Sequence, residues 1–237
     1  MYRQVEDALI ARLERPSQVY RLDVTSPESV RDALAGENFA SVIAIGQGAL
    51  AAVDGTGLEV IHAQIFKAPT GEHRGVAAIP PFEMQLAYWK SLSPDLERVG
   101  VIASSNMRAV VDSLAKAAAE QGIDLLRSEV KSDKEMLFEF RRMVLHIDGF
   151  VFLPDDAVLS PYVIRRVMQH SVVNQKQILT YSAAMFRLGA FLYVTPVQDE
   201  VAARIVTLLE DPERGAAPLT MLRARVQGRD GYVDVSG

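Results

Sequence analysis

The sequence has no cysteine in its 237 residues. This absence excludes disulfide scaffolds, thiolate zinc sites, iron–sulfur clusters and cysteine nucleophiles, although it suits a periplasmic protein as well as a cytosolic one. Long apolar runs are missing too, since no run approaches the roughly 20 residues that cross a bilayer. The N-terminus is polar where a signal peptide would be apolar. We therefore expect neither a membrane span nor an export leader in the chain as printed.

The chain also has no excess of positive charge. Lys and Arg total 25 against 30 Asp and Glu, which gives a formal net charge of -5. Nucleic-acid binders usually carry a basic surface, so we expect no nucleic-acid partner. Aromatic residues reach only 7%, whereas 49% of the residues are hydrophobic and 23% are charged. This composition is typical of a folded globular chain with one large domain or two smaller ones.

Segments with strand and helix patterns alternate along the chain. Residues 19–24 alternate and are rich in β-formers, which predicts a strand, and the apolar run at residues 41–45 predicts a buried one. Between them, Ser26-Pro27 supplies an N-cap and an N1 proline for a helix. Further strands are predicted at residues 59–66, 98–103, 123–130, 149–153, 177–181 and 190–194, and helices at residues 2–15, 26–34, 49–53, 82–92, 107–121, 133–146, 161–173 and 199–210.

This order of strands and helices predicts an α/β fold with parallel sheets covered by helices. Two α/β units of about 100 residues each fit the usual size of a domain. We expect two Rossmann-like lobes, each a parallel sheet flanked by helices. The predicted lobes comprise residues 1–95 with 197–225 and residues 96–196 with 226–237. The tail after residue 210, rich in Pro, Gly and Arg, is assigned no helix or strand.

Polar loops follow several of the predicted strands. Ligands of open parallel sheets bind at the carboxyl ends of the strands, so these loops are the candidate site. The loops are Gly46-Gln47-Gly48, Lys67–Thr70, Ser104–Asn106, Asp155-Asp156 and Tyr181-Ser182. Each residue alone has an alternative interpretation as a helix cap or a turn residue. Their origin in both halves of the chain favours a binding site.

Signatures of catalysis, cofactors and metals are missing. The segment after Gly46 has two glycines of the dinucleotide fingerprint but Ala51 in place of the third, so no nicotinamide site is expected. Asp155 and Asp156 are adjacent on a strand end and point in different directions, which argues against a metal pair. The histidines lack metal-ligand spacing, and no nucleophile elbow, Walker A or kinase motif occurs. We expect no cofactor, no metal and no enzymatic activity.

Four local motifs point to one protein family. Gly75-Val76 enters a helix with Gln85 near its middle, and the phrase at residues 92–102 has a Ser-Pro break before arginine, valine, glycine and valine. Residues 148–155 read as aspartate, apolar strand, proline and aspartate, and residues 178–182 read as a strand and a serine before a Gly-Ala turn. In these motifs the chain resembles the ABC-transporter substrate-binding family of the tryptophan/tyrosine type, which has the type I periplasmic binding protein fold.

The resemblance implies a protein that captures a small molecule, an amino acid or a similar compact polar solute, between lobes that close by a hinge motion. An ABC permease as partner and a periplasmic location are implied with it. Asp155 would accept from a ligand ammonium, backbone N–H groups at Gln47 would hold a carboxylate, and Phe66 would stack on an apolar portion. The expected ligand-binding residues are Gly46, Gln47, Phe66, Ser104, Ser105, Asn106, Asp155, Tyr181 and Ser182.

The family starts with a strand before its first helix, whereas this chain starts inside that helix at Tyr2. The first lobe is therefore expected to lack the usual first strand, whose loss leaves neighbouring strands unpaired. Two explanations stay open. Either the numbering begins at an internal methionine of a longer exported precursor, or a divergent member fills the gap with another segment or with the second subunit of a homodimer.

A ligand-sensing domain of the same fold, acting in signalling or regulation rather than uptake, is the alternative function. Fold alone does not separate the two. An α/β enzyme with an unrecognised site ranks third, with Asp155, Asp156 and Lys67 as its candidate titrating residues.

Overall fold

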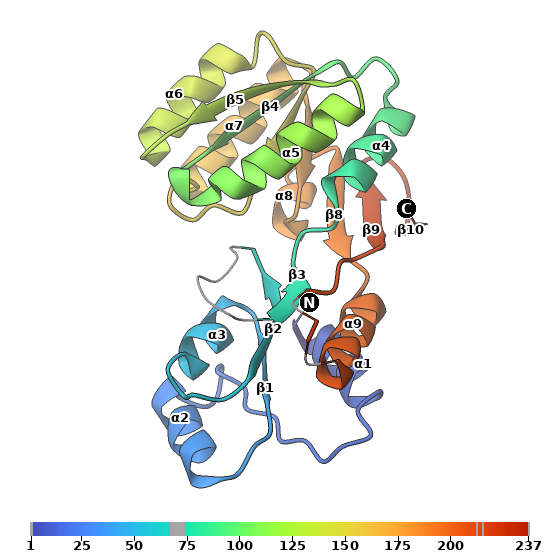
Figure 1. Cartoon of the computed structure of the whole chain (residues 1–237). Coiled ribbons are helices and arrows are strands. Elements are labelled where there is room, and N and C mark those ends of the chain that lie inside the picture. Colours follow the sequence, from blue (N-terminus) through green and yellow to red (C-terminus); the bar gives the residue numbers. More distant parts are fainter. Residues whose placement is uncertain (1, 67–73, 212, 215, 237) are drawn as a thin grey trace. The chain divides into compact units, whose positions relative to one another are not determined.

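The computed structural model describes residues 2–66, 74–211, 213–214 and 216–236. The chain divides into two compact units, Met1–Ile79 with Pro196–Thr220 and Pro80–Thr195 with Met221–Gly237. Each unit contains a sheet with helices on both faces (Figure 1). The predicted α/β class is therefore confirmed in each unit.

The first unit is built on a three-stranded parallel sheet. In sheet order its strands are β1 (Val42–Ile45), β2 (Val60–Ile65) and β3 (Arg74–Ala77), and its helices are α1 (Tyr2–Ile10), α2 (Pro27–Gly36), α3 (Gln47–Val53) and α9 (Gln198–Glu210). Helices α1 and α9 bury Val5 and Ile205 against Ile61 on one face of the sheet. Helices α2 and α3 bury Val30 and Leu50 against the other face.

The strand predicted at Val19–Val24 does not form. The segment is an irregular turn, and Val24 is 82% exposed. An extended segment becomes a strand only when a neighbour takes up its backbone hydrogen bonds, and no described strand lies beside this one. Tyr20 packs against the α2–α3 cluster, Arg21 pairs with Glu6 of α1, and the N–H of Val24 donates to the carbonyl of Arg21 in a local turn. The prediction of a strand was wrong because it rested on the local pattern alone, which does not show whether a neighbouring strand is present.

The second unit contains a seven-stranded sheet. In sheet order its strands are β10 (Val233–Ser236), β9 (Met221–Val226), β8 (Leu192–Pro196), β7 (Gln177–Thr180), β6 (Gly149–Phe152), β4 (Arg98–Ala103) and β5 (Asp124–Glu129). Its helices are α4 (Phe82–Leu92), α5 (Arg108–Glu120), α6 (Asp133–Met143), α7 (Pro161–Val173) and α8 (Ala183–Arg187), with a 3-10 turn at Ser105–Met107. The strands from β8 to β5 are parallel, and β10 runs antiparallel to β9.

Two strands lie in the tail that was assigned no structure. In β9, Leu222, Ala224 and Val226 are buried and alternate with half-buried Arg223 and Arg225. This period of two is the strand pattern, although arginines occupy its other face. Arg223 forms an ion pair with Asp234 of β10 at 2.7 Å, and the Arg225 guanidinium lies over the rings of Phe186 and Tyr232.

Helix α4 belongs to the second unit, whereas the predicted lobes placed residues 80–95 in the first. Its fully buried Trp89 explains the grouping. The indole N–H donates to Gln177 Oε1 at 2.6 Å, and the ring packs over Gly149 so closely that a Cβ there would lie 2.5 Å from it. Residues 221–225 likewise join the second unit because they form β9.

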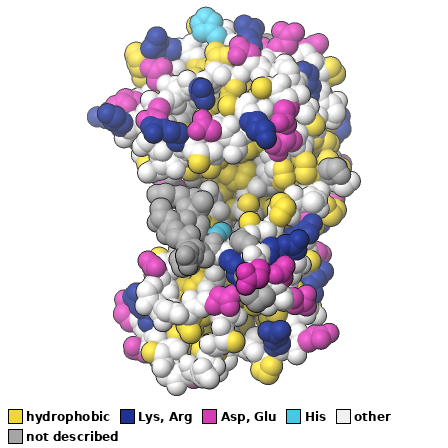
Figure 2. All heavy atoms as spheres, viewed as in Figure 1, with side chains coloured by type: hydrophobic (Ala, Val, Ile, Leu, Met, Phe, Trp, Pro, Cys, Tyr) yellow, Lys and Arg dark blue, Asp and Glu magenta, His cyan; other side chains and the backbone are white. Residues whose placement is uncertain are grey.

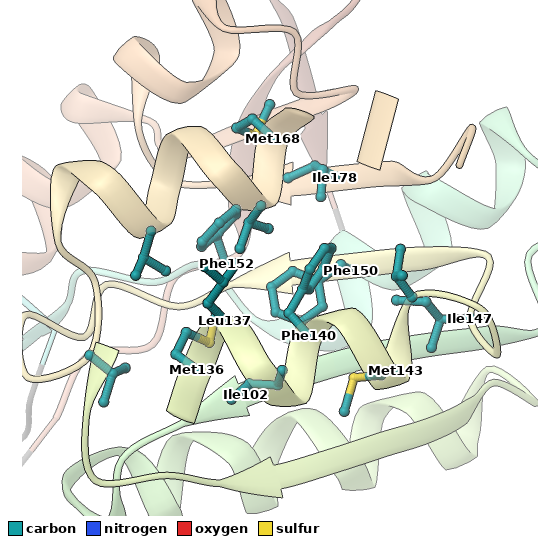
Figure 3. Packing of buried hydrophobic residues seen from close by; sticks show 14 of the residues in the cluster. Ile102, Met136, Leu137, Phe140, Met143, Ile147, Phe150, Phe152, Met168 and Ile178 are labelled. Carbon is teal, nitrogen blue, oxygen red and sulfur yellow. The ribbon is translucent and has the colours of Figure 1, made fainter. Parts of the chain in front are cut away.

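The core under α6 and α7 is aromatic at its centre (Figure 3). Phe150 packs edge to face against Phe140 of α6, with ring centroids 5.0 Å apart, and against Phe152, at 5.4 Å. Met136 and Ile102 lie around this group. Such rings bury large apolar areas in preferred geometries, which fixes the helices on this face of the sheet.

The surface mixes charges of both signs. On the face that Figure 2 shows, Lys and Arg side chains lie interspersed with Asp and Glu. Within the described ranges, the structure contains no helix with the length and apolar character that a membrane crossing requires.

We expect Gly149→Ala to lower the free energy of unfolding by about 1–3 kcal/mol, because the new methyl group overpacks the site of the Trp89 ring. Gly36→Ala is the control. Nothing lies within 4 Å of a Cβ at Gly36 in α2, so its stability should stay equal or rise by up to about 1 kcal/mol. Urea unfolding followed by tryptophan fluorescence measures both. Equal stability of Gly149→Ala and the wild type would contradict this packing.

Candidate functional site

Asp155 ties together two loops at the carboxyl edge of the seven-stranded sheet. Its Oδ2 accepts the backbone N–H of Ser104 at 2.6 Å, and its Oδ1 accepts the Ser104 hydroxyl at 3.1 Å and the N–H of Ala157 at 3.2 Å. Asp155 is 5% exposed and Ser104 7%. The parallel pairing of β4 with β6 places these loops side by side. The carboxylate therefore joins the loop after β4 to the loop after β6.

Ser105 and Asn106 are exposed in the 3-10 turn that follows Ser104. A hollow of about 290 Å³ opens beside Ser104, lined by residues of α5 and β5. Two ion pairs lie on its wall, Arg108 to Glu129 at 2.8 Å and Arg127 to Asp112 at 3.3 Å. The charges around this hollow therefore already neutralise each other.

Tyr181 and Ser182 follow β7 at the same edge of the sheet. The Tyr181 hydroxyl donates to Gln85 Oε1 at 2.9 Å, and Gln85 Nε2 donates to the carbonyl of Pro80 at 2.6 Å. Burial raises the pKa of Tyr181 far above its ordinary value, so this hydroxyl stays protonated. The Ser182 hydroxyl accepts the N–H of Met185 at 3.4 Å and caps α8. Both side chains therefore stabilise the local structure, Tyr181 through Gln85 and Ser182 as a helix cap.

In the first unit the predicted residues follow β1 and β2. Gly46 has φ +93, a backbone conformation that favours glycine, and its N–H donates to the carbonyl of Ala63 at 2.8 Å. Gln47 is exposed at the start of α3, and Phe66 is half-buried just beyond β2. The predicted loop Lys67–Thr70 and His73 lie outside the described residues.

Taken together, the predicted residues fall into two sets. Ser104, Ser105, Asn106, Asp155, Tyr181 and Ser182 share the carboxyl edge of the sheet of the second unit, and Gly46, Gln47 and Phe66 share that of the first. Direct contact is seen between Ser104 and Asp155. Their roles as ligand contacts stay predictions.

Two buried glutamines of the first unit were not predicted from the sequence. Gln64 in β2 is 1% exposed and Gln198 at the start of α9 is 8% exposed. In the sequence, Gln64 reads as the outward position of an alternating strand, so the pattern hides its burial. Within the described ranges, no three His, Asp or Glu side chains gather as metal ligands.

The profile of the family described as ABC transporter substrate binding protein matches residues 49–206, about two thirds of the sequence. The chain belongs to this family. Its members bind a substrate for an ABC transporter, so the chain has a solute-binding role. A comparison with curated protein sequences finds no match.

Solved structures of this fold are similar over nearly the whole chain. An ABC domain of Streptococcus pneumoniae in complex with L-Trp has a TM-score of 0.61 at 19% identity, with 95% of this chain and 86% of that one covered. An ABC transporter substrate-binding protein of Desulfitobacterium hafniense in complex with Leu also has a TM-score of 0.61, at 13% identity and 98% and 95% coverage. The transcription regulator CcpA of Lactococcus lactis scores 0.53 at 11% identity, with 99% and 90% covered. These likenesses confirm the predicted type I periplasmic binding protein fold.

We expect Asp155→Asn to lower the free energy of unfolding by about 1.5–3 kcal/mol in the absence of any solute, because the carboxylate accepts charge-assisted hydrogen bonds from Ser104 and Ala157. Asp156→Asn at the exposed neighbouring position is the matched control and should change stability by less than about 0.5 kcal/mol. Urea denaturation of both variants measures the difference. If the two variants are equally stable, the hydrogen bonds of Asp155 do not stabilise the loops.

Proposed function

We propose that the protein captures a compact polar solute, with α-amino acids as the first candidates, and delivers it to an ABC permease in the periplasm. The match of the chain to the substrate-binding family carries this proposal. Neighbours of the same fold in complex with L-Trp and with Leu support the choice of amino acids. The absence of a membrane-crossing helix from the described residues is compatible with a carrier outside the membrane.

The proposed contacts are the predicted residues at the strand ends of each unit. In the second unit, exposed Ser105 and Asn106 offer hydrogen bonds at the edge where Asp155 orders the loops. In the first unit, the N–H groups at Gln47 and the ring of Phe66 offer a polar and an apolar contact. Variants in each unit test each set of contacts separately.

Capture without chemical change is part of this proposal. The carboxylate of Asp155 is occupied by loop hydrogen bonds, and the Tyr181 hydroxyl is buried against Gln85 and held protonated. Neither group is placed as a general base. Conversion of a bound solute by the purified protein would contradict this part.

A second candidate is a sensing domain that reports solute binding to a regulator. The likeness to a transcription regulator of Lactococcus lactis favours it, at a lower TM-score than the substrate-binding proteins have. The two functions differ in the partner. A solute-dependent rise in the ATPase rate of the cognate transporter supports delivery, and no effect on that transporter supports sensing.

Amino acids should raise the melting temperature of the purified protein. A ligand that binds only the folded state at a hundred times its Kd stabilises it by about 2.7 kcal/mol, which is about 5–10 °C for a chain of this size. We expect such a shift with L-leucine, L-tryptophan or a related amino acid in a thermal-shift panel that includes nucleosides, small peptides and organic acids. A cooperative melting curve that no amino acid moves would contradict the proposed solute class.

A further inference from the structure

Gln64 has an unusual backbone conformation for a strand residue. It lies near the end of β2 with φ +58, in the left-handed region that side chains other than glycine avoid. The register of β2 against β3 shifts between Ala63 and Ile65, so Gln64 is the extra residue of a bulge. Strained residues of this kind cluster at ligand-binding positions.

The bulge changes which side chains meet which face of the sheet. Ile61 and Ala63 pack with α1 and α9, whereas Ile65 packs with α2 and α3. An uninterrupted strand would put Ile65 on the same face as Ile61 and Ala63. The single extra residue therefore turns Ile65 to the opposite face of the sheet just before β2 ends.

The carboxamide of Gln64 is buried without a hydrogen bond. Its Oε1 and its Nε2 have no partner among the described residues, although the residue is only 1% exposed. Buried polar groups are almost always paired, because an unpaired one loses its hydration without compensation. A strained position and an unpaired carboxamide at one residue together destabilise the free protein, and their coincidence points to a ligand at this place.

Gln198 provides a second unpaired carboxamide oxygen. Its Nε2 donates to the carbonyl of Pro196 at 3.0 Å, but its Oε1 has no partner within the part of the chain described, at 8% exposure. Gln198 is the first residue of α9, and no side chain caps this helix.

The direction of α9 puts Gln198 at the same edge of the sheet as Gln64. Arg74, the first residue of β3, donates to the carbonyls of Leu208 and Asp211 at 2.7 and 2.8 Å. The end of α9 therefore lies at the beginning of β3, and this helix of 13 residues is about 20 Å long. Its start lies at the opposite, carboxyl edge, where β2 ends at Gln64 and Ile65.

The free atoms define the chemistry of a suitable ligand. Gln64 offers one acceptor oxygen and an NH2 group with two N–H donors, and Gln198 offers a second acceptor oxygen. Two acceptors and a donor group at one edge of the sheet suit an ammonium group with a neighbouring carboxylate. Neutral amides also leave no formal charge buried in the protein before the solute binds.

We propose that Gln64 and Gln198 recognise the charged head of the solute, with both Oε1 atoms accepting from its ammonium and Gln64 Nε2 donating to its carboxylate. This inference rests on the proposed function and assigns the solute class to primary amino acids. It also assigns recognition of the ammonium to neutral acceptors of the first unit and not to Asp155. The oxygens of Asp155 already accept hydrogen bonds from Ser104 and Ala157.

The test compares Gln64→Met with the wild type in the full chain. Methionine has nearly the same shape and no amide, so binding of L-leucine or L-tryptophan, whichever binds the wild type better, should weaken at least tenfold by calorimetry. The melting temperature of the free variant should rise by about 2–4 °C, because an unpaired buried group is removed. Gln175→Met is the matched control. Gln175 also has a positive φ, 54, but is exposed in the second unit, and its replacement should leave affinity unchanged.

Deaminated analogues sharpen the test. The wild type should prefer the amino acid over its deaminated analogue at least tenfold, and Gln64→Met should lose most of that preference, because both changes remove the same hydrogen bond. Gln198→Met should reduce the preference in the same direction and provides a second variant if Gln64→Met does not fold.

The outcomes separate this inference from the proposed function. A wild type that binds amino acids, with Gln64→Met and Gln198→Met binding them equally well and with the same preference, overturns this inference alone. A lowered melting temperature in those variants would then mark the two carboxamides as structural only. A folded wild type that binds no amino acid overturns the proposed solute class and this inference together.

Discussion

Parallel pairing of strands is the constraint on which both units depend. Because parallel strands run in one direction, every loop that leaves a carboxyl end emerges at the same edge of the sheet. The register of β4 with β6 and of β6 with β7 brings the loops at Ser104, Asp155 and Tyr181 to one edge, although they are far apart in sequence. The geometry of the candidate site is in this sense a consequence of sheet topology.

The same constraint explains which parts of the fold the sequence could predict. Apolar runs such as residues 41–45 and 149–153 carry their own signal, because a strand between two helical layers is apolar throughout. Val19–Val24 carries an equally good local pattern, but a strand also needs a neighbour, and local pattern contains no information about one. Strand β9 was missed for the opposite reason, since its arginines obscure an alternation that the pairing with β10 makes regular.

The candidate site was predictable in position but not in the state of its side chains. Strand ends identified Asp155 and Tyr181 from the order of elements alone. Whether a carboxylate there is free or engaged depends on the loop beside it, and the Ser104 N–H at 2.6 Å is a long-range contact that no local motif encodes. Gln64 is a second residue whose environment the local sequence does not reveal. Among its alternating neighbours it reads as a polar position, whereas the structure buries it at a bulge that depends on the pairing of β2 with β3.

Asp155 and Gln64 are buried polar residues with opposite effects on the stability of the free protein. Asp155 has its hydrogen bonds satisfied within the fold, so its burial stabilises the loops whether or not a solute is present. Gln64 is left unsatisfied, at a stability loss of about 1–3 kcal/mol that a bound partner can recover. Energy recovered on binding adds to the affinity for a ligand that supplies the missing donors and acceptors, and a ligand that lacks them gains none of it. An unpaired carboxamide in the free protein therefore favours selectivity for a polar head group over affinity for apolar solutes in general, which is the property that a carrier of compact polar solutes requires.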